Sequence, residues 1–125
     1  MVAIKQIANW RFLAWLRSRN AGGWNIYVSV NAVTANGRSR ARDRVSAVRH
    51  VFLEADQDGP QVLAQLANRS DLPPPSYLLH SSRNRVHVFW RVAGFDIASV
   101  EALQKQLAHE LNTDTAATSC SQTTR

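Results

Sequence analysis

The clearest strand pattern in the chain lies at residues 48–56, where an apolar run changes to alternating apolar and acidic positions. This pattern predicts a β-strand that buries one side. Successive side chains of a strand point to opposite faces, so Glu54 and Asp56 share one face and lie ~6–7 Å apart along it. Leu53 and Ala55 point the other way, toward the expected core. The strand is therefore predicted to end with two carboxylates side by side.

Helical periodicity and turn residues divide the rest of the chain into further elements. The predicted elements are a helix over 3–19, a strand over 25–31, a helix from Pro60 to about Asn68, a hairpin of 76–82 and 86–92, and a helix from Asp96 to about Asn112. A tail over 113–125 is rich in Thr and Ser and has no periodicity. The chain shows no repeat and no linker. We therefore predict a single α+β domain over 1–125, with a largely antiparallel central sheet and its helices within 25–112.

The predicted hairpin places a histidine among arginines. An even-length connection would set Ser82 opposite Arg85 and His80 opposite His87, with these side chains on one face. His87 also shares its face with Arg91, which lies four positions further along the strand. Such a histidine can donate a hydrogen bond to a phosphate. The alternative is a half-exposed strand histidine without a role, and His80 is expected to be structural.

Charge is distributed unevenly along the chain. The formal net charge is +6, and the basic residues are concentrated in the first 50 positions, which favours a surface that binds a polyanion. Arg38, Arg40, Arg42 and Arg44 alternate along a polar segment, so an extended backbone would present them on one side. We expect this row to contact nucleic-acid phosphates. The alternative is a solvated basic face with no partner.

Cysteine content and hydropathy exclude several classes of protein. The single cysteine, Cys120, allows no intramolecular disulfide and fits a reducing, cytoplasmic location. The longest apolar run, Phe12 to Leu16, is far shorter than the ~20 residues of a membrane-spanning helix, so no membrane partner is expected.

Two adjacent carboxylates repel each other unless a cation lies between them. Hard divalent cations such as Mg²⁺ bind carboxylate oxygens and complete their coordination with water and substrate phosphates. Glu54 and Asp56 are therefore candidate metal ligands; the alternative is that one caps the next helix and the other faces solvent. Asp114 joins them only if the fold brings it to them. Asp58 precedes Gly59-Pro60 and is better explained as a residue of the helix start.

The order of these motifs resembles the RepB-like primases of plasmids and phages, which belong to the archaeo-eukaryotic primase superfamily. The resemblance is carried by Phe52-Leu53-Glu54-Ala55-Asp56, the Pro-rich connector 72–75, Ser82 to His87, Val88-Phe89-Trp90, and Asp114. Residues 19–28 also look like the helix-to-strand entry of such domains. The resemblance implies an RRM-like catalytic core.

The same resemblance implies a function and a set of site residues. The protein would be a nucleotidyltransferase that makes primers from nucleoside triphosphates on single-stranded DNA, with Mg²⁺ or Mn²⁺ as cofactor and a replicative helicase as a further partner. Glu54, Asp56 and Asp114 would bind the metal and, with His87, form the catalytic site. The implied nucleotide-binding residues are Ser82, Arg83, Arg85, His87 and Arg125.

Three features depart from the family pattern. The first acid is Glu54, where aspartate is more usual, and its additional methylene would shift the metal. The loop Arg83-Asn84-Arg85 lacks the glycines common there. The chain also stops at Arg125, before an arginine-leucine-proline-glycine stretch and a downstream asparagine and lysine of the family. A truncated or partial catalytic core is therefore expected.

Two other classes remain open at this point. A non-catalytic module for single-stranded nucleic acid would stack bases on Tyr27, Phe89 or Trp90 and would bind without metal; an inactive primase remnant is a related possibility. A rolling-circle initiator or relaxase needs a nucleophilic tyrosine and two metal-binding histidines one residue apart. The segment Val86-His87-Val88 lacks that pair.

Overall fold

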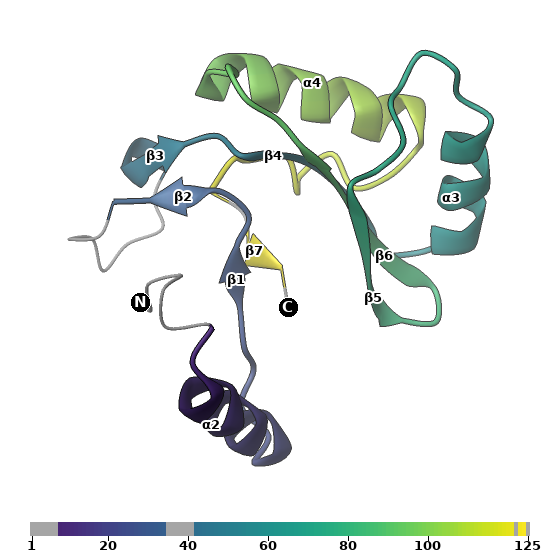
Figure 1. Ribbon diagram of the computed structural model, residues 1–125. Coiled ribbons are helices and arrows are strands. Elements are labelled where there is room, and N and C mark those ends of the chain that lie inside the picture. Colours follow the sequence, from purple (N-terminus) through teal and green to yellow (C-terminus); the bar gives the residue numbers. More distant parts are fainter. Residues whose placement is uncertain (1–7, 35–41, 122, 125) are drawn as a thin grey trace.

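The protein is an α+β domain with antiparallel strand pairing, seen in a computed structural model that describes residues 8–34, 42–121 and 123–124 (Figure 1). In chain order the elements are α2 (Trp10–Ala21), β1 (Val28–Ser29), β2 (Ala32–Val33), the 3₁₀ helix η1 (Arg42–Arg44), β3 (Val45–Ala47), β4 (His50–Ala55), α3 (Gly59–Ala67), β5 (Tyr77–Ser82), β6 (Arg85–Arg91), α4 (Ile97–Glu110) and β7 (Thr123–Thr124). Within this described part of the chain, no helix is both long enough and apolar enough to cross a bilayer.

The central sheet has three strands in the order β4-β6-β5, and two short ladders, β1-β7 and β2-β3, accompany it. Val51, Leu53 and Ala55 of β4 project into the main core, as do Val86 and Val88 of β6. The predicted alternation of these strands is therefore confirmed. Figure 1 shows α4 over β4 and α3 beside β6, and both helices contribute apolar side chains to this core. The opposite face of the sheet carries a smaller apolar cluster of Val30, Phe52 and Phe89, with polar side chains beside it.

The start of α3 docks closely on the loop of the hairpin. The backbone N–H of Gly59 donates to the carbonyl of Asn84 at 2.9 Å. A Cβ atom at position 59 would lie 2.8 Å from that carbonyl oxygen, a distance that no side chain tolerates without backbone movement. Asp58 occupies the N-cap position of α3, so its predicted place at the helix start is confirmed; its φ is 57° and its side chain makes no cap hydrogen bond. This contact holds the end of β4 against the β5–β6 turn.

The hairpin register differs from the prediction at one position. Ser82 pairs with Arg85 as expected, but His80 pairs with Val86, and Leu79 lies opposite His87. The register shifts between His80 and Ser82, because an extra residue is accommodated there as in a β-bulge. The predicted pairing of His80 with His87 was therefore wrong.

The tail has more structure than its composition predicted. Thr118 and Cys120 are buried, and Thr123–Thr124 pairs antiparallel with β1. Gln104 of α4 holds this segment: its side chain accepts from Phe52 N at 3.1 Å and donates to Thr118 O at 2.7 Å. The lack of periodicity misled the prediction because this segment is fixed by polar contacts to its backbone.

The N-terminal third also departs from expectation. The described helix runs from Trp10 to Ala21, two residues beyond the predicted end at position 19, and Gly22 caps it. The strand predicted over 25–31 is reduced to Val28–Ser29, with a second short strand at Ala32–Val33. Positions 3–7 of the predicted helix lie outside the described residues.

Candidate active site

The two predicted acids lie at the end of β4 on the face opposite the main core. Glu54 is the fifth residue of the strand and Asp56 follows its last residue. Leu53 and Ala55, which alternate with them, are buried in the core. Both acids are partly exposed, so their carboxylates remain accessible to a ligand. The sequence-based placement of this pair on one face is consistent with the position of its neighbours.

Each acid has a basic side chain of β6 opposite it. Glu54 pairs directly with His87 across the β4–β6 ladder, and its Oε1 lies 3.7 Å from His87 Nε2. Asp56 Oδ1 lies 3.6 Å from Arg85 Nε. Both distances are too long for a hydrogen bond. Asp56 and Arg85 carry opposite charges and attract each other at this distance, whereas Glu54 and His87 do so only when the imidazole is protonated. The two pairs lie two residues apart along both strands, so each acid faces a nitrogen-bearing side chain at this corner of the sheet.

His87 is more enclosed than its arginine neighbours suggested. Its side chain is only 7% exposed, and its ring stacks on Phe89 with centroids 6.5 Å apart. The alternative left open above, a half-exposed histidine at this position, is therefore wrong. The ring is held between Glu54 and an aromatic neighbour, so its orientation is fixed.

The hairpin turn presents the other predicted nucleotide ligands to solvent. Ser82, Arg83 and Arg85 are all exposed. Arg85 turns toward Asp56 through the 3.6 Å contact. Because Arg85 lies beside Asp56, this turn is near the acids, and its exposed side chains can contact a charged ligand from the solvent side. Arg125 lies outside the described residues.

Asp114 does not join the acids in the described part of the chain. Residues 8–34, 42–121 and 123–124 contain no group of three or more His, Cys, Asp or Glu side chains that could hold a metal ion. Asp114 is exposed, and its Oδ1 accepts from the Ala116 backbone N–H at 2.8 Å, a local turn contact. The three-carboxylate site therefore stays a prediction. Glu54 and Asp56 offer carboxylate oxygens, the donor type that suits a hard divalent cation whose remaining ligands are water and phosphate.

An aromatic and imidazole network lies on the same sheet face and was missed from the sequence. His50 Nδ1 lies 2.7 Å from the Val30 carbonyl, which can only accept, so Nδ1 carries the hydrogen. In the neutral ring Nε2 then accepts from the Tyr77 hydroxyl at 2.7 Å. Burial raises the pKa of Tyr77 above its ordinary value, while the charge of Arg91 opposes that shift, so the phenol stays a donor. The signal that could have revealed this network is the alternation of strand residues, which places His50 on the same face as Glu54.

The predicted arginine row is only partly described. Arg42 and Arg44 lie in the 3₁₀ helix η1, so the expected extended, one-sided arrangement is wrong for these two residues. Residues two apart in a 3₁₀ helix point in different directions. Arg42 Nε donates to Glu101 Oε2 at 2.9 Å, while Arg44 is exposed. Arg38 and Arg40 lie outside the described residues.

Burial also bears on the stacking-module alternative. Phe89 and Trp90 are buried at 2% and 6% exposure, and the Trp90 indole N–H donates to Pro73 O at 2.9 Å. Neither ring presents a face to a base. Tyr27 is exposed at 56% and is the member of this predicted set that could stack.

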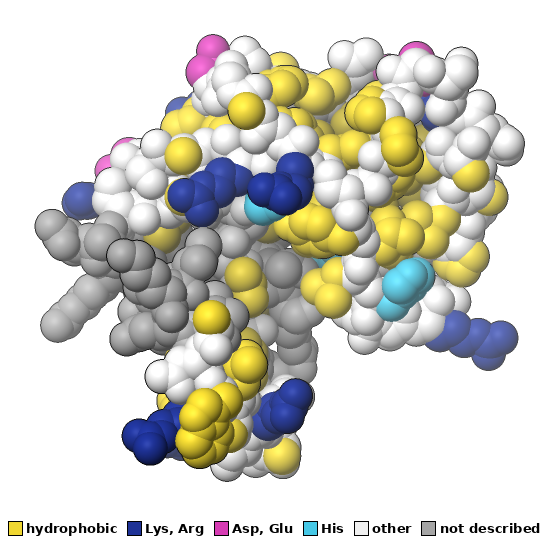
Figure 2. Space-filling model, viewed as in Figure 1, with side chains coloured by type: hydrophobic (Ala, Val, Ile, Leu, Met, Phe, Trp, Pro, Cys, Tyr) yellow, Lys and Arg dark blue, Asp and Glu magenta, His cyan; other side chains and the backbone are white. Residues whose placement is uncertain are grey.

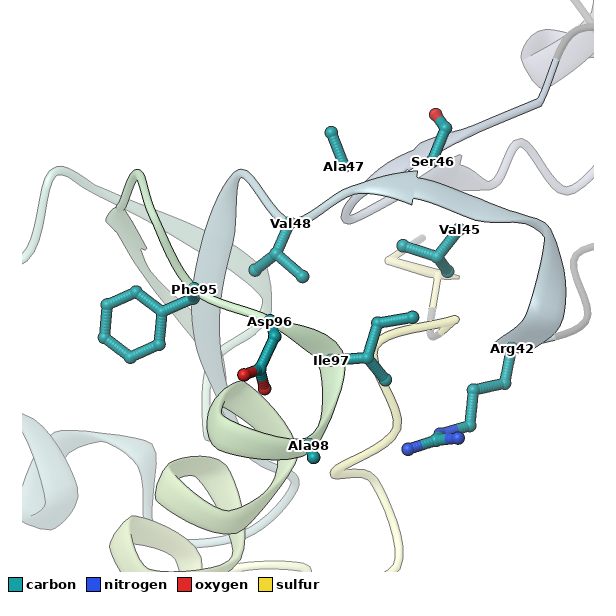
Figure 3. Close-up of a pocket in the computed structure, with 9 residues that line it drawn as sticks. All are labelled: Arg42, Val45, Ser46, Ala47, Val48, Phe95, Asp96, Ile97 and Ala98. Carbon is teal, nitrogen blue, oxygen red and sulfur yellow. The ribbon is translucent and has the colours of Figure 1, made fainter.

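Charged side chains are unevenly distributed over the visible face, and one pocket lies away from the acids. Figure 2 shows Lys and Arg side chains near the middle of this face and along α2, with Asp and Glu toward its upper edges. The pocket in Figure 3 lies elsewhere, between β3 and the start of α4, where Val45, Val48 and Ile97 point toward one another. Its acid, Asp96, already accepts from Ser99 N at 2.7 Å as the cap of α4. This pocket therefore does not contribute to the acid site.

Comparisons with known proteins place the chain in a family. Residues 1–125 match the family described as RepB DNA-primase N-terminal domain. Among solved structures, the chain is similar to the AEP domain of the primase-polymerase (PrimPol) of cyanophage S-2L, with a TM-score of 0.69 and 24% identity. That similarity covers 90% of this chain and 58% of the other, so the chain spans little more than half of that structure. No curated protein matches the chain.

Proposed function

The chain belongs to the family of RepB DNA-primase N-terminal domains, and from this premise we propose that it is a primase-type nucleotidyltransferase. In the proposed reaction a 3′-hydroxyl oxygen forms a bond to the α-phosphorus of a nucleoside triphosphate. The bond from that phosphorus to the bridging oxygen breaks, pyrophosphate leaves, and the hydroxyl proton passes to water. Single-stranded DNA is the template, and the cytoplasm is the proposed location.

The observation that carries this proposal is the corner where β4 ends and β6 begins. Glu54 lies opposite His87 and Asp56 lies beside Arg85, so two acids stand next to two side chains that could donate to phosphate oxygens. Carboxylates alone would repel a triphosphate. Arg85, whose Nε lies 3.6 Å from Asp56 Oδ1, offsets that repulsion, which makes the corner suited to a phosphate ester carried with a cation.

Glu54 and Asp56 would hold the divalent cation, Mg²⁺ or Mn²⁺, because their oxygens are the donor type such ions prefer. When bound, the ion supplies positive charge that stabilises the phosphates during the displacement. In this proposal Asp114 is the third ligand. Its carboxylate accepts from Ala116 N, so residues 114–116 would have to rearrange for it to reach the acids.

The basic residues would position the triphosphate. Arg83 and Arg85 are exposed and can make charge-assisted hydrogen bonds to phosphate oxygens. His87, held by its neighbours, would donate to a phosphate oxygen through the small part of its ring that is open, and Ser82 would shape the turn. Arg125 is proposed as a further triphosphate ligand.

The template contact is proposed for the basic segment that ends at η1. Arg44 is exposed, whereas Arg42 is engaged with Glu101 and would have to leave that ion pair to bind a phosphate. Arg38 and Arg40 complete the proposed set. A replicative helicase remains a proposed partner on the basis of the family alone.

The test is nucleotide incorporation on a single-stranded DNA template with and without a Glu54→Gln/Asp56→Asn double substitution. Both changes keep side-chain size and remove charge. We expect incorporation to require Mg²⁺ or Mn²⁺ and to fall at least about 100-fold in the double variant, since losing an electrostatic group at a reacting phosphate costs on the order of 10²–10³ in rate. Product is measured by gel separation of labelled primers.

A matched control is Asp58→Asn, in the same segment. Asp58 is exposed, makes no cap hydrogen bond, and has the positive φ that asparagine tolerates. This variant should retain incorporation. Metal-dependent synthesis that persists in the folded double variant would remove Glu54 and Asp56 from the reaction.

A further inference from the structure

We propose that α2 and the turn that follows it form a separate binding surface for single-stranded DNA. This tryptophan–arginine surface consists of Trp10, Arg11, Trp15, Arg19 and Trp24. Its role as a template contact rests on the proposed function, but its binding of nucleic acid does not depend on catalysis. It lies apart from the acid corner: Figure 1 shows α2 beyond β1, away from the β4–β6 pairing.

The three indole rings of this surface are open to solvent. Trp10 is 71% exposed, Trp15 48% and Trp24 62%. No residue of α2 is buried, so the helix contributes no side chain to the core of the domain. Tryptophan is among the least favourable side chains to leave in water, and exposed apolar groups that gather in one place mark binding surfaces.

Each indole is accompanied by a guanidinium. Arg19 Cζ lies 4.8 Å from the ring centroid of Trp24 and 5.4 Å from that of Trp15. Arg11 Cζ lies 5.4 Å from the Trp10 ring. Arg11, Trp15 and Arg19 follow one another at four-residue spacing, so they line one side of α2. The result is a row in which planar cations and planar rings alternate.

The charge of this segment is uniformly positive. Residues 8–34 contain arginines at positions 11, 17 and 19 and no aspartate or glutamate. A ligand that suits both features must carry negative charges at regular intervals and expose flat aromatic faces between them. Single-stranded nucleic acid has this chemistry, with bases that stack on indoles and phosphates that pair with arginines. A duplex hides its base faces and would use only the arginines.

The helix is a poor match to the other occupants that a basic, aromatic helix could have. A helix that lies in a membrane interface separates its apolar and basic faces. Here Trp10 and Trp15 are five residues apart and point about 140° away from each other around the helix. Arg11 lies between them in direction, so apolar and basic side chains are interleaved. Phe12 and Leu16 share a side of α2 with Trp15, but Arg19 falls within the same sector, so a partner helix would meet a cation there.

The test measures binding of a fluorescein-labelled oligodeoxythymidylate to the full chain by fluorescence anisotropy, without nucleotide or metal. The main variant is Trp15→Leu/Trp24→Leu, which keeps apolar bulk and removes two aromatic faces. We expect its dissociation constant to rise at least about tenfold. A second variant, Arg19→Gln, should reduce the slope of log affinity against log salt by about 0.7.

A matched control is Phe95→Leu. Phe95 is also an exposed aromatic residue, at 37%, and no arginine lies over its ring among the described residues. This variant should bind like the parent chain. Circular dichroism of all variants should show unchanged helix content.

Three outcomes would overturn the inference. The first is unchanged affinity in the folded double variant, and the second is equal affinity for duplex DNA of the same length. The third is loss of binding to phosphatidylglycerol vesicles with DNA affinity intact, which would identify a membrane surface. Because no nucleotide is present, a chain that binds through this surface but incorporates nothing would support the inference while the proposed function failed.

Discussion

A single buried amide, that of Asn31, joins three segments of the chain. Its Oδ1 accepts from the backbone N–H groups of Arg49 and His50 at 2.7 and 3.0 Å, and its Nδ2 donates to Cys120 O at 3.2 Å. The residue is 3% exposed. The Asn31 amide therefore fixes both the start of β4 and the tail. The position of His50, and with it the hydrogen bond to Tyr77, depends on this amide.

We expect Asn31→Ala to lower the free energy of unfolding by about 2–4 kcal/mol, because a buried donor or acceptor left without a partner costs ~1–3 kcal/mol. Urea unfolding followed by circular dichroism measures the change. Asn25→Ala is the matched control, since Asn25 is exposed and should shift stability by no more than about 0.5 kcal/mol. Equal stability of the two variants would show that the amide is dispensable.

At the level of elements, α4 is both a cover for the sheet and the anchor of the tail. One turn of its inner side carries Glu101 and Gln104, which bind the backbone of residues 118–120. Glu101 also accepts from Arg42. Burial alone would raise the pKa of Glu101, but the hydrogen bonds from the Cys120 backbone and from Arg42 lower it below 4.5. The charged carboxylate is therefore what the fold prefers.

A depressed carboxyl pKa contributes stability above its unfolded value, and this contribution is lost as the pH falls through the folded value. We expect the parent chain to have a higher Tm than Glu101→Gln at pH 7. The difference should shrink as the pH is lowered below 4.5, the ordinary value for this side chain. Thermal unfolding from pH 3 to 7 tests this, and a difference that is independent of pH would contradict it.

For the whole molecule, the two faces of one sheet are used differently. One face meets α3, α4 and Cys120 in an apolar core, and the other carries acids, imidazoles and stacked aromatic rings. Cys120 is 1% exposed and comes from the tail, so the core is complete only when that segment is docked. Its thiol is thus a reporter for the folded state of the entire domain.

Burial, with the nearby Glu101 carboxylate, raises the pKa of Cys120 from 9.0 to about 11. Near pH 8 the native chain should therefore hold about 100-fold less thiolate at this site than the unfolded chain, and burial slows access further. Reaction with a disulfide reagent, followed by absorbance, should be slow in buffer and fast in urea. Labelling at the rate of a free thiol in buffer would mean that the tail is undocked.

Much of this architecture follows from local pattern, and the exceptions have physical causes. The ends of α3 and α4, and the pairing of Ser82 with Arg85, could be predicted because caps, proline and alternation act over a few residues. The shift of His80 away from His87 could not be predicted, because the β-bulge does not change the alternation of apolar and polar residues in the sequence. Likewise the tail lacks periodicity, and only the buried side chain of Gln104 reveals how it is held.

Some features of the candidate site could also be predicted from local pattern, and others could not. The sharing of one face by Glu54 and Asp56 is a matter of strand geometry and needs no tertiary information. The approach of His87 to Glu54 depends on pairing between segments more than thirty residues apart. Whether Asp114 reaches them depends on how the chain turns after α4, which short-range pattern does not specify. His50 was overlooked because its role comes from Val30 and Tyr77, distant along the sequence.

The close backbone approach at Gly59 constrains the candidate site beside it. The loop that carries the arginines meets the start of α3, three residues after Asp56, where only a hydrogen atom fits. A methyl group added at position 59 would push the loop away from α3. We therefore expect position 59 to tolerate substitution as poorly as the proposed metal ligands do.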